Sequence, residues 1–190
     1  GTLGSSLTGS TVQTIDYGSD CTAVTANAPV GYHLTGWTGG YVGTDNPLVV
    51  TNVTSALTIP ANFAINQYRV EFVIDGTPGS SLTGATVQTV VHGSDCTVVT
   101  ANAPANYHFA GWNGGYVGMD NPLTVTNVTS ALTITANFAI DTYRVEFETD
   151  GTPGATLTGA TVQTIAHGSN CTAVTANTPV GYHFTGWTGG

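Results

Sequence analysis

The 190-residue sequence contains no lysine and only two arginines, Arg69 and Arg144, against eleven acidic residues. Its formal net charge is -9, although charged residues make up only 7% of the chain. Proteins bind nucleic acids and anionic membrane surfaces through clustered Lys and Arg side chains. This composition therefore excludes nucleic acid as a partner. The absence of lysine also excludes Lys–Asn isopeptide cross-links as a covalent reinforcement.

Long apolar runs are missing as well. Apolar residues make up 41% of the chain, but they are interleaved with Thr, Ser and Asn. No run approaches the ~18 apolar residues of a membrane-spanning helix. The first four residues have neither the basic nor the apolar region of a signal peptide. We therefore predict no membrane insertion and no targeting segment within this sequence. We also predict no bound cofactor.

What the sequence does contain is a tandem repeat. The segment Gly-Ser-Asp-Cys at 18–21 returns at 93–96 and, with Asn in place of Asp, at 168–171. These copies follow one another at a constant step of 75 residues. Self-similarity at a fixed step is the signature of a repeat architecture. The same step separates the three tryptophans, Trp37, Trp112 and Trp187.

The phase of the repeat predicts three domains. Residues 1–67 form a first repeat that lacks its opening strand, 68–142 form a complete repeat, and 143–190 form a third repeat that stops before its last strands. We expect such a chain to be part of a longer array. The segment from Phe138 to Tyr143 passes directly from one predicted strand to the next, so we expect limited motion between neighbouring repeats.

Each period contains short segments that predict β-strands. Tyr68, Val70, Phe72 and Ile74 alternate with other residues, which places them on one face of a strand. A turn follows at 75–79. No window has the 3.6-residue apolar period of a helix, so we predict an all-β module of about six short strands, arranged as a β-sandwich or β-grasp-like fold. The other predicted strands are 85–91, 96–101, 107–112, 123–127 and 132–138.

Five short motifs of one period resemble the divergent internalin B-type repeat of bacterial surface and secreted proteins. They are Tyr-x-Val-x-Phe at 68–72, Val-Thr-Ala-x-x-Pro at 99–104, Tyr-x-Phe-x-Gly-Trp at 107–112, Asn-Pro-Leu-x-Val at 121–125 and Ala-Asn-Phe at 136–138. The resemblance implies a β-rich module related to β-grasp-like repeats. It also implies a spacer, stalk or adhesive element outside the cell, without catalytic residues.

The sequence departs from this pattern in having one cysteine per period: Cys21, Cys96 and Cys171. A single cysteine cannot form a disulfide inside its own repeat. A bridge between modules or between chains would contribute about 2–4 kcal/mol. The alternative role is that of a small buried hydrophobic residue. The polar residues at 94, 95 and 97 favour a loop edge over a deep core, and the sequence leaves both roles open.

Aromatic and histidine side chains suggest an adhesive surface. Tyrosines follow the Gly-Gly turns, where we expect exposure, and histidines alternate with aromatic residues in a strand, where we expect them to face solvent or a groove. Trp112 is expected to pack in the core beside Tyr107 and Phe109. The candidate surface residues are Tyr41, Tyr116, His33, His108 and His183.

Metal and catalytic sites are not expected. His92 and His167 precede their cysteines by four residues, a spacing that could suit a soft metal, but the first repeat has Tyr17 at this position. The aspartates show no Asp-x-Asp-x-Asp spacing for calcium. No nucleophile motif or phosphate-binding glycine loop occurs. We predict no catalytic, cofactor-binding or metal-binding residue, and no enzymatic activity.

The predicted function is a structural repeat of an extracellular or cell-surface stalk, adhesin or self-assembling fibre. Its expected partners are other copies of the chain, with a glycan or cell-surface molecule as a further partner. The alternative is a carbohydrate-binding adhesive module that uses exposed Tyr and Trp side chains.

Overall fold

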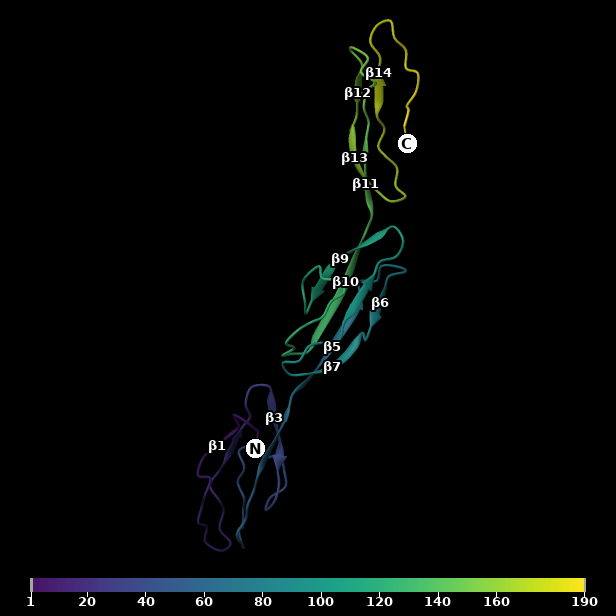
Figure 1. Ribbon diagram of the computed structural model, residues 1–190. Coiled ribbons are helices and arrows are strands. Elements are labelled where there is room, and N and C mark those ends of the chain that lie inside the picture. Colours follow the sequence, from purple (N-terminus) through teal and green to yellow (C-terminus); the bar gives the residue numbers. More distant parts are fainter. Residues whose placement is uncertain (1, 190) are drawn as a thin grey trace.

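The computed structural model describes residues 2–189, which form three modules arranged in an elongated row (Figure 1). The described residues contain β-strands and no helix. Thr and Val are abundant in these strands, as expected for residues that fit a pleated sheet. The prediction of an all-β chain built from small repeated modules is therefore confirmed.

The middle module has six strands. Four of them form a mixed sheet in the order β7-β5-β10-β9, in which β5 and β10 are parallel and the outer pairs are antiparallel. The other two, β6 and β8, form a separate antiparallel pair. The strands are β5 (Gln67–Ile74), β6 (Ser81–Gly84), β7 (Val87–Val91), β8 (Val99–Asn102), β9 (Tyr107–Gly114) and β10 (Leu132–Ile140).

Two details of the middle module differ from the sequence-based strands. A parallel pair needs a long crossover connection, and here the crossover from β5 to β10 consists of four short strands and their loops. One of these, β6, was not predicted, because its four residues follow directly after a turn. The segment 123–127, predicted as a strand, makes only an isolated bridge between Leu123 and Val99, the first residue of β8. Its other backbone bond to this region is the one that the carbonyl of Val125 accepts from the N–H of Cys96.

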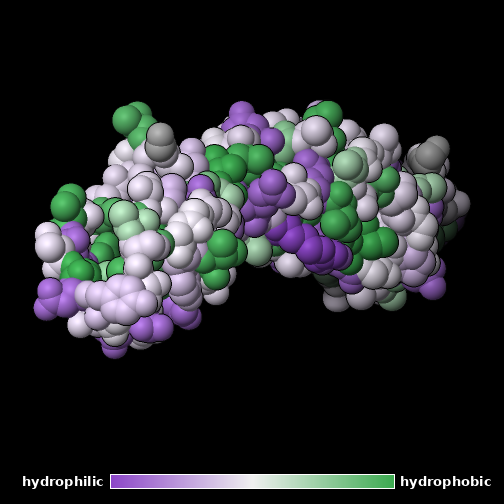
Figure 2. Space-filling model, turned by 90° about the horizontal axis from the view of Figure 1, so that it is seen from below, coloured by the Kyte–Doolittle hydropathy of each residue, from purple (hydrophilic) through white to green (hydrophobic). Residues whose placement is uncertain are grey.

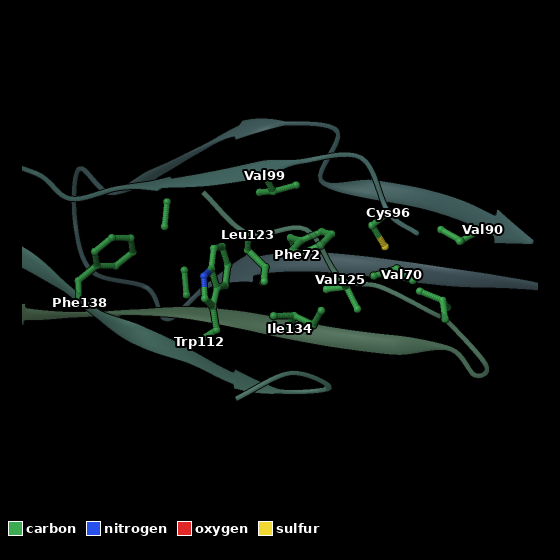
Figure 3. Close-up of a cluster of buried hydrophobic side chains, with 13 residues drawn as sticks. Val70, Phe72, Val90, Cys96, Val99, Trp112, Leu123, Val125, Ile134 and Phe138 are labelled. Atoms are coloured by element: carbon green, nitrogen blue, oxygen red, sulfur yellow. The ribbon is translucent and has the colours of Figure 1, made fainter. Parts of the chain in front are cut away.

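The core of the middle module lies between the four-stranded sheet and the β6/β8 pair (Figure 3). Trp112 is only 2% exposed, and its ring meets Phe72 and Phe109 edge-on at centroid distances of 5.9 and 5.4 Å. Its indole N–H donates to the carbonyl of Asp120 at 2.7 Å, so the one polar atom of the ring is satisfied. Trp112 therefore packs in the core, as expected.

Amide side chains extend the sheet pairing. Oε1 of Gln88 accepts the N–H of Thr97 at 2.7 Å, and Nε2 donates to the carbonyl of Thr97 at 3.0 Å. Asn121 pairs in the same way with the N–H and carbonyl of Ala101, both at 2.8 Å. Each amide thus replaces one residue of a β-ladder. These residues were missed from the sequence, although Gln13, Gln163 and Asn46 recur at the 75-residue step and make equivalent bonds.

The first and third modules each contain four strands in two antiparallel pairs, β1-β2 and β3-β4, then β11-β13 and β12-β14. β4 begins directly after Pro60, which lacks the N–H needed for sheet pairing. The strands are β1 (Ser6–Thr8), β2 (Thr25–Asn27), β3 (Tyr32–Trp37), β4 (Ala61–Ile65), β11 (Thr142–Glu146), β12 (Thr156–Thr158), β13 (Val162–Ala166) and β14 (Thr175–Asn177).

Candidate interaction surfaces

The loop after each Gly-Gly turn is held by a tyrosine and an aspartate. The Tyr116 hydroxyl donates to Oδ2 of Asp120 at 2.6 Å, and Tyr41 donates to Asp45 in the same way. This hydrogen bond to a carboxylate raises the pKa of Tyr116, as it does for Tyr41. Both rings are only half-exposed because they pack against the cores of their modules. The two tyrosines therefore fix the loop and offer little free aromatic surface.

The residues at the tips of these loops are far more exposed. Val117 and Met119 are 78% and 65% exposed, and Val42 occupies the same position as Val117 in the first module. Figure 2 shows one face of the molecule, on which separate apolar patches are divided by polar surface. Trp37 and Trp112 are buried. The expectation of an adhesive surface with exposed Trp is therefore wrong for these two residues, because their rings fill the module cores.

The histidines predicted to belong to the adhesive surface lie away from these loop tips. Nδ1 of His33 lies 2.7 Å from Oδ1 of Asn66, and Nδ1 of His108 lies 2.9 Å from Oδ1 of Asp141. His108 is near the start of β9, whereas the Tyr116 loop follows its end. His183 is exposed in the third module. The candidate adhesive residues are therefore not gathered into one surface, and their part in adhesion stays a prediction.

A single residue lies between the last strand of one module and the first strand of the next. Asn66 follows β4 and precedes β5, and Asp141 follows β10 and precedes β11. The N–H of Asn66 donates to the carbonyl of Gly31 at 2.7 Å, and its carbonyl accepts the N–H of His92 at 2.8 Å. Each joint thus has a linker bonded to both flanking modules. Asp141 makes the equivalent bonds with Asn106 and His167, both at 2.8 Å.

The sequence model of the divergent InlB B-repeat domain matches residues 1–67, 71–142 and 145–190. The chain belongs to this family. Each match begins within a few residues of the start of one structural module, so one B-repeat corresponds to one module. A search of the curated proteins and of the solved structures found no match.

The cysteines of the three B-repeats differ in burial. Cys96 is 5% exposed and lies among the core residues near Val70, Val90 and Val125 (Figure 3). This burial, together with the nearby Asp95 carboxylate, raises the pKa of the Cys96 thiol. The expected loop-edge position is therefore wrong for Cys96, because its N–H pairs with the carbonyl of Val125 and its side chain enters the core.

The other two thiols are more accessible. Cys21 is half-buried and Cys171 is exposed, and all three cysteines are free thiols in this structure. A disulfide between B-repeats or between chains stays a prediction. For Cys96 it would require the middle B-repeat to open, because a buried thiol cannot meet a partner from another molecule.

Grooves lined by both apolar and polar residues lie in the two outer B-repeats. The first has a groove of about 560 Å³, lined in part by Leu48, Val50 and Ile59. The residues 75 positions further on are Leu123, Val125 and Ile134, which are buried in the middle B-repeat around β5. Residues equivalent to the core of the middle repeat thus border a groove in the first, where Leu48 alone of the three is buried. A second groove, of about 750 Å³, lies in the third B-repeat beside Phe184 and Trp187.

Within residues 2–189, no group of three or more His, Cys, Asp or Glu side chains is arranged to hold a metal ion. The described part of the chain also contains no helix that is long and apolar enough to cross a membrane.

Proposed function

We propose that this chain is a structural segment of an extracellular or cell-surface stalk or fibre, and that it has no catalytic activity. The observation that supports this most directly is the pair of one-residue linkers, each bonded to both neighbouring B-repeats. Such linkers leave almost no slack between modules, so the chain can span distance as an extended row. The resemblance to B-repeats of bacterial surface and secreted proteins favours a position outside the cell.

The shape of the isolated chain tests this proposal. At roughly 3.3 Å per strand residue, three modules in a row extend to about 100 Å, which corresponds to a radius of gyration of about 30 Å. A compact chain of this length would have a radius of gyration of about 16 Å. Small-angle X-ray scattering distinguishes the two values. A result near the compact value would overturn the proposal of an extended rod.

Self-association extends the same proposal, with other copies of the chain as the partner. Electron microscopy of the native material is the direct test. Regular filaments are expected if the segments assemble into a fibre. Dispersed single particles at all concentrations would contradict self-assembly and leave a stalk as the remaining form of the structural function.

A second candidate function is glycan binding by the Gly-Gly-Tyr loops. It is favoured by the exposed loop tips, where Val42 and Val117 occupy equivalent positions in two modules and Met119 adds to the second tip. We expect Tyr116→Ala to abolish saturable glycan binding, because it releases the loop from Asp120. Val117→Ser is the matched variant that changes the tip and keeps this bond. An unchanged glycan array for both variants would remove this function.

A further inference from the structure

The two joints between B-repeats share one backbone pattern but differ in their side chains. In both joints the linker N–H binds the preceding module and the linker carbonyl binds the following one. The first joint has Gly31 and Asn66, whereas the second has Asn106 and Asp141 at the equivalent positions. The chain thus offers an internal comparison between two joints that differ at a few residues.

The first joint is closely packed. Gly31 is buried, and a Cβ atom placed on it would lie only 2.2 Å from Cδ2 of His92. The imidazole of one module therefore rests directly on the backbone of its neighbour. Gly31 also has a φ of +79°, a conformation in which glycine is favoured. This contact exists because residue 31 has no side chain.

The second joint cannot have the same contact. Asn106 keeps the positive φ, at +67°, but it has a side chain and is exposed. His167, the counterpart of the half-buried His92, is exposed. Tyr143 is 52% exposed, whereas its counterpart Tyr68 is half-buried. These three residues of the second joint are therefore more open to solvent than their counterparts in the first.

The two joints also differ in the hydrogen bonds that their linker side chains make. Oδ1 of Asn66 lies 2.7 Å from Nδ1 of His33, and its Nδ2 donates to the Tyr68 hydroxyl oxygen at 3.4 Å. That hydroxyl in turn lies 3.4 Å from Nδ1 of His92. An amide can accept and donate at once, so Asn66 joins both modules through one chain of polar contacts.

An ionised carboxylate can only accept hydrogen bonds. Asp141 contacts His108 of the preceding module at 2.9 Å. Among residues 2–189, its side chain makes no hydrogen bond to the following module. The polar chain that crosses the first joint therefore stops at the linker in the second.

We propose that the first joint is rigid and the second compliant. The difference is set by Gly31 and Asn66 in the first joint and by Asn106 and Asp141 at the equivalent positions of the second. The array would then alternate between stiff and flexible joints according to sequence variation at these two positions of the repeat. This inference concerns the joints alone. It can fail while the rod remains extended, and it can hold if the chain forms no filaments.

Exchange of the joint residues tests the proposal. The variants are Gly31→Asn with Asn66→Asp in the first joint, and Asn106→Gly with Asp141→Asn in the second. Spin labels are placed on cysteines introduced at Thr8, Thr83 and Thr158, which are exposed strand residues 75 positions apart. The native cysteines are replaced by alanine in every sample. Double electron–electron resonance then gives the distance distribution across each joint.

In the parent chain we expect the distance distribution between labels at 8 and 83, across the first joint, to be narrower than that between labels at 83 and 158, across the second. The exchange in the first joint should broaden the 8–83 distribution to the width of the 83–158 distribution. The exchange in the second joint should narrow the 83–158 distribution. Because Asn already occupies the positive-φ position in the second joint, these variants are expected to fold, and unchanged thermal melting verifies this. Equal widths in the parent, or widths that do not respond to either exchange, would overturn the proposal.

Discussion

Oδ2 of Asp75 accepts a hydrogen bond from the backbone N–H of Phe138 at 2.9 Å, although the two residues lie 63 positions apart in the sequence. Asp75 follows the end of β5, and Phe138 lies at the irregularity in the pairing of β10 with β9. Oδ1 of the same carboxylate accepts the N–H of Thr77 at 2.9 Å. One side chain therefore fixes both the turn after β5 and the bulge of the neighbouring strand.

Asp75→Ala should destabilise the middle B-repeat by about 1–2 kcal/mol, because two backbone N–H groups lose a charged acceptor. Hydrogen exchange measured by mass spectrometry reports the stability of each module separately. The matched control is Asp150→Ala, since Asp150 accepts the N–H of Thr152 but has no long-range hydrogen-bond partner among residues 2–189. Equal losses in the two variants would show that the bond to Phe138 contributes nothing.

Stability should also depend on the ionisation of Asp75. Desolvation, the largest single influence, raises its pKa, but the hydrogen bonds from Phe138 and Thr77 together outweigh it, so the pKa is lowered. A lowered pKa in the folded state stabilises the fold above the unfolded pKa of about 3.9 and loses this effect as the pH falls through the folded pKa. The urea midpoint should therefore fall more steeply below pH ~4 in the parent than in Asp75→Asn. Parallel curves would contradict this.

Gln88→Ala should cost about 2 kcal/mol, because it removes a buried amide and leaves the N–H and carbonyl of Thr97 without their partner. Gln13→Ala removes the same bonds at a more exposed position of the first B-repeat, where water can replace them. We expect Gln13→Ala to lower the free energy of unfolding by less than Gln88→Ala does. Hydrogen exchange of the segments around Thr97 and Thr22 measures both effects, and a larger loss for Gln13→Ala would refute the argument.

Trypsin should cleave first after Arg144. The chain has only two tryptic sites, Arg69 and Arg144. Arg69 lies in β5, which is paired on both edges, whereas Arg144 lies in β11, which within the described part of the chain pairs with β13 alone. Cleavage requires local opening, which is easier at a strand held on one side. Mass spectrometry should detect fragments 1–144 and 145–190 before any product cut at Arg69. Early cleavage at Arg69 would reverse this order of stability.

The three thiols should react in the order of their exposure. Cys171 should be alkylated fastest, Cys21 more slowly, and Cys96 slowest, because burial hinders access and a raised pKa lowers the thiolate fraction. Peptide mapping after timed alkylation gives the three rates. In urea the rates should converge. A Cys96 rate equal to that of Cys171 without denaturant would show that the middle core is open.

Much of the fold could be predicted from local pattern. The alternation in 68–74 predicted β5, because a half-buried strand must alternate between two faces, and the segment 132–138 was also predicted as a strand, which is β10. The bridge at Leu123 and the strand β6 were not predicted, since both depend on partners distant in sequence. The joints illustrate the same limit. The sequence predicted a near-absent linker, but the contact of His92 with Gly31 required the coordinates.

The sequence by itself determined that this is a tandem all-β chain with a 75-residue step, because strand periodicity and repetition are properties of neighbouring residues. Only the tertiary structure decided what equivalent residues do. Cys21, Cys96 and Cys171 share nearly the same local sequence, yet their burial ranges from core to solvent. Burial depends on strands contributed from elsewhere in each module, and no local pattern contains that information.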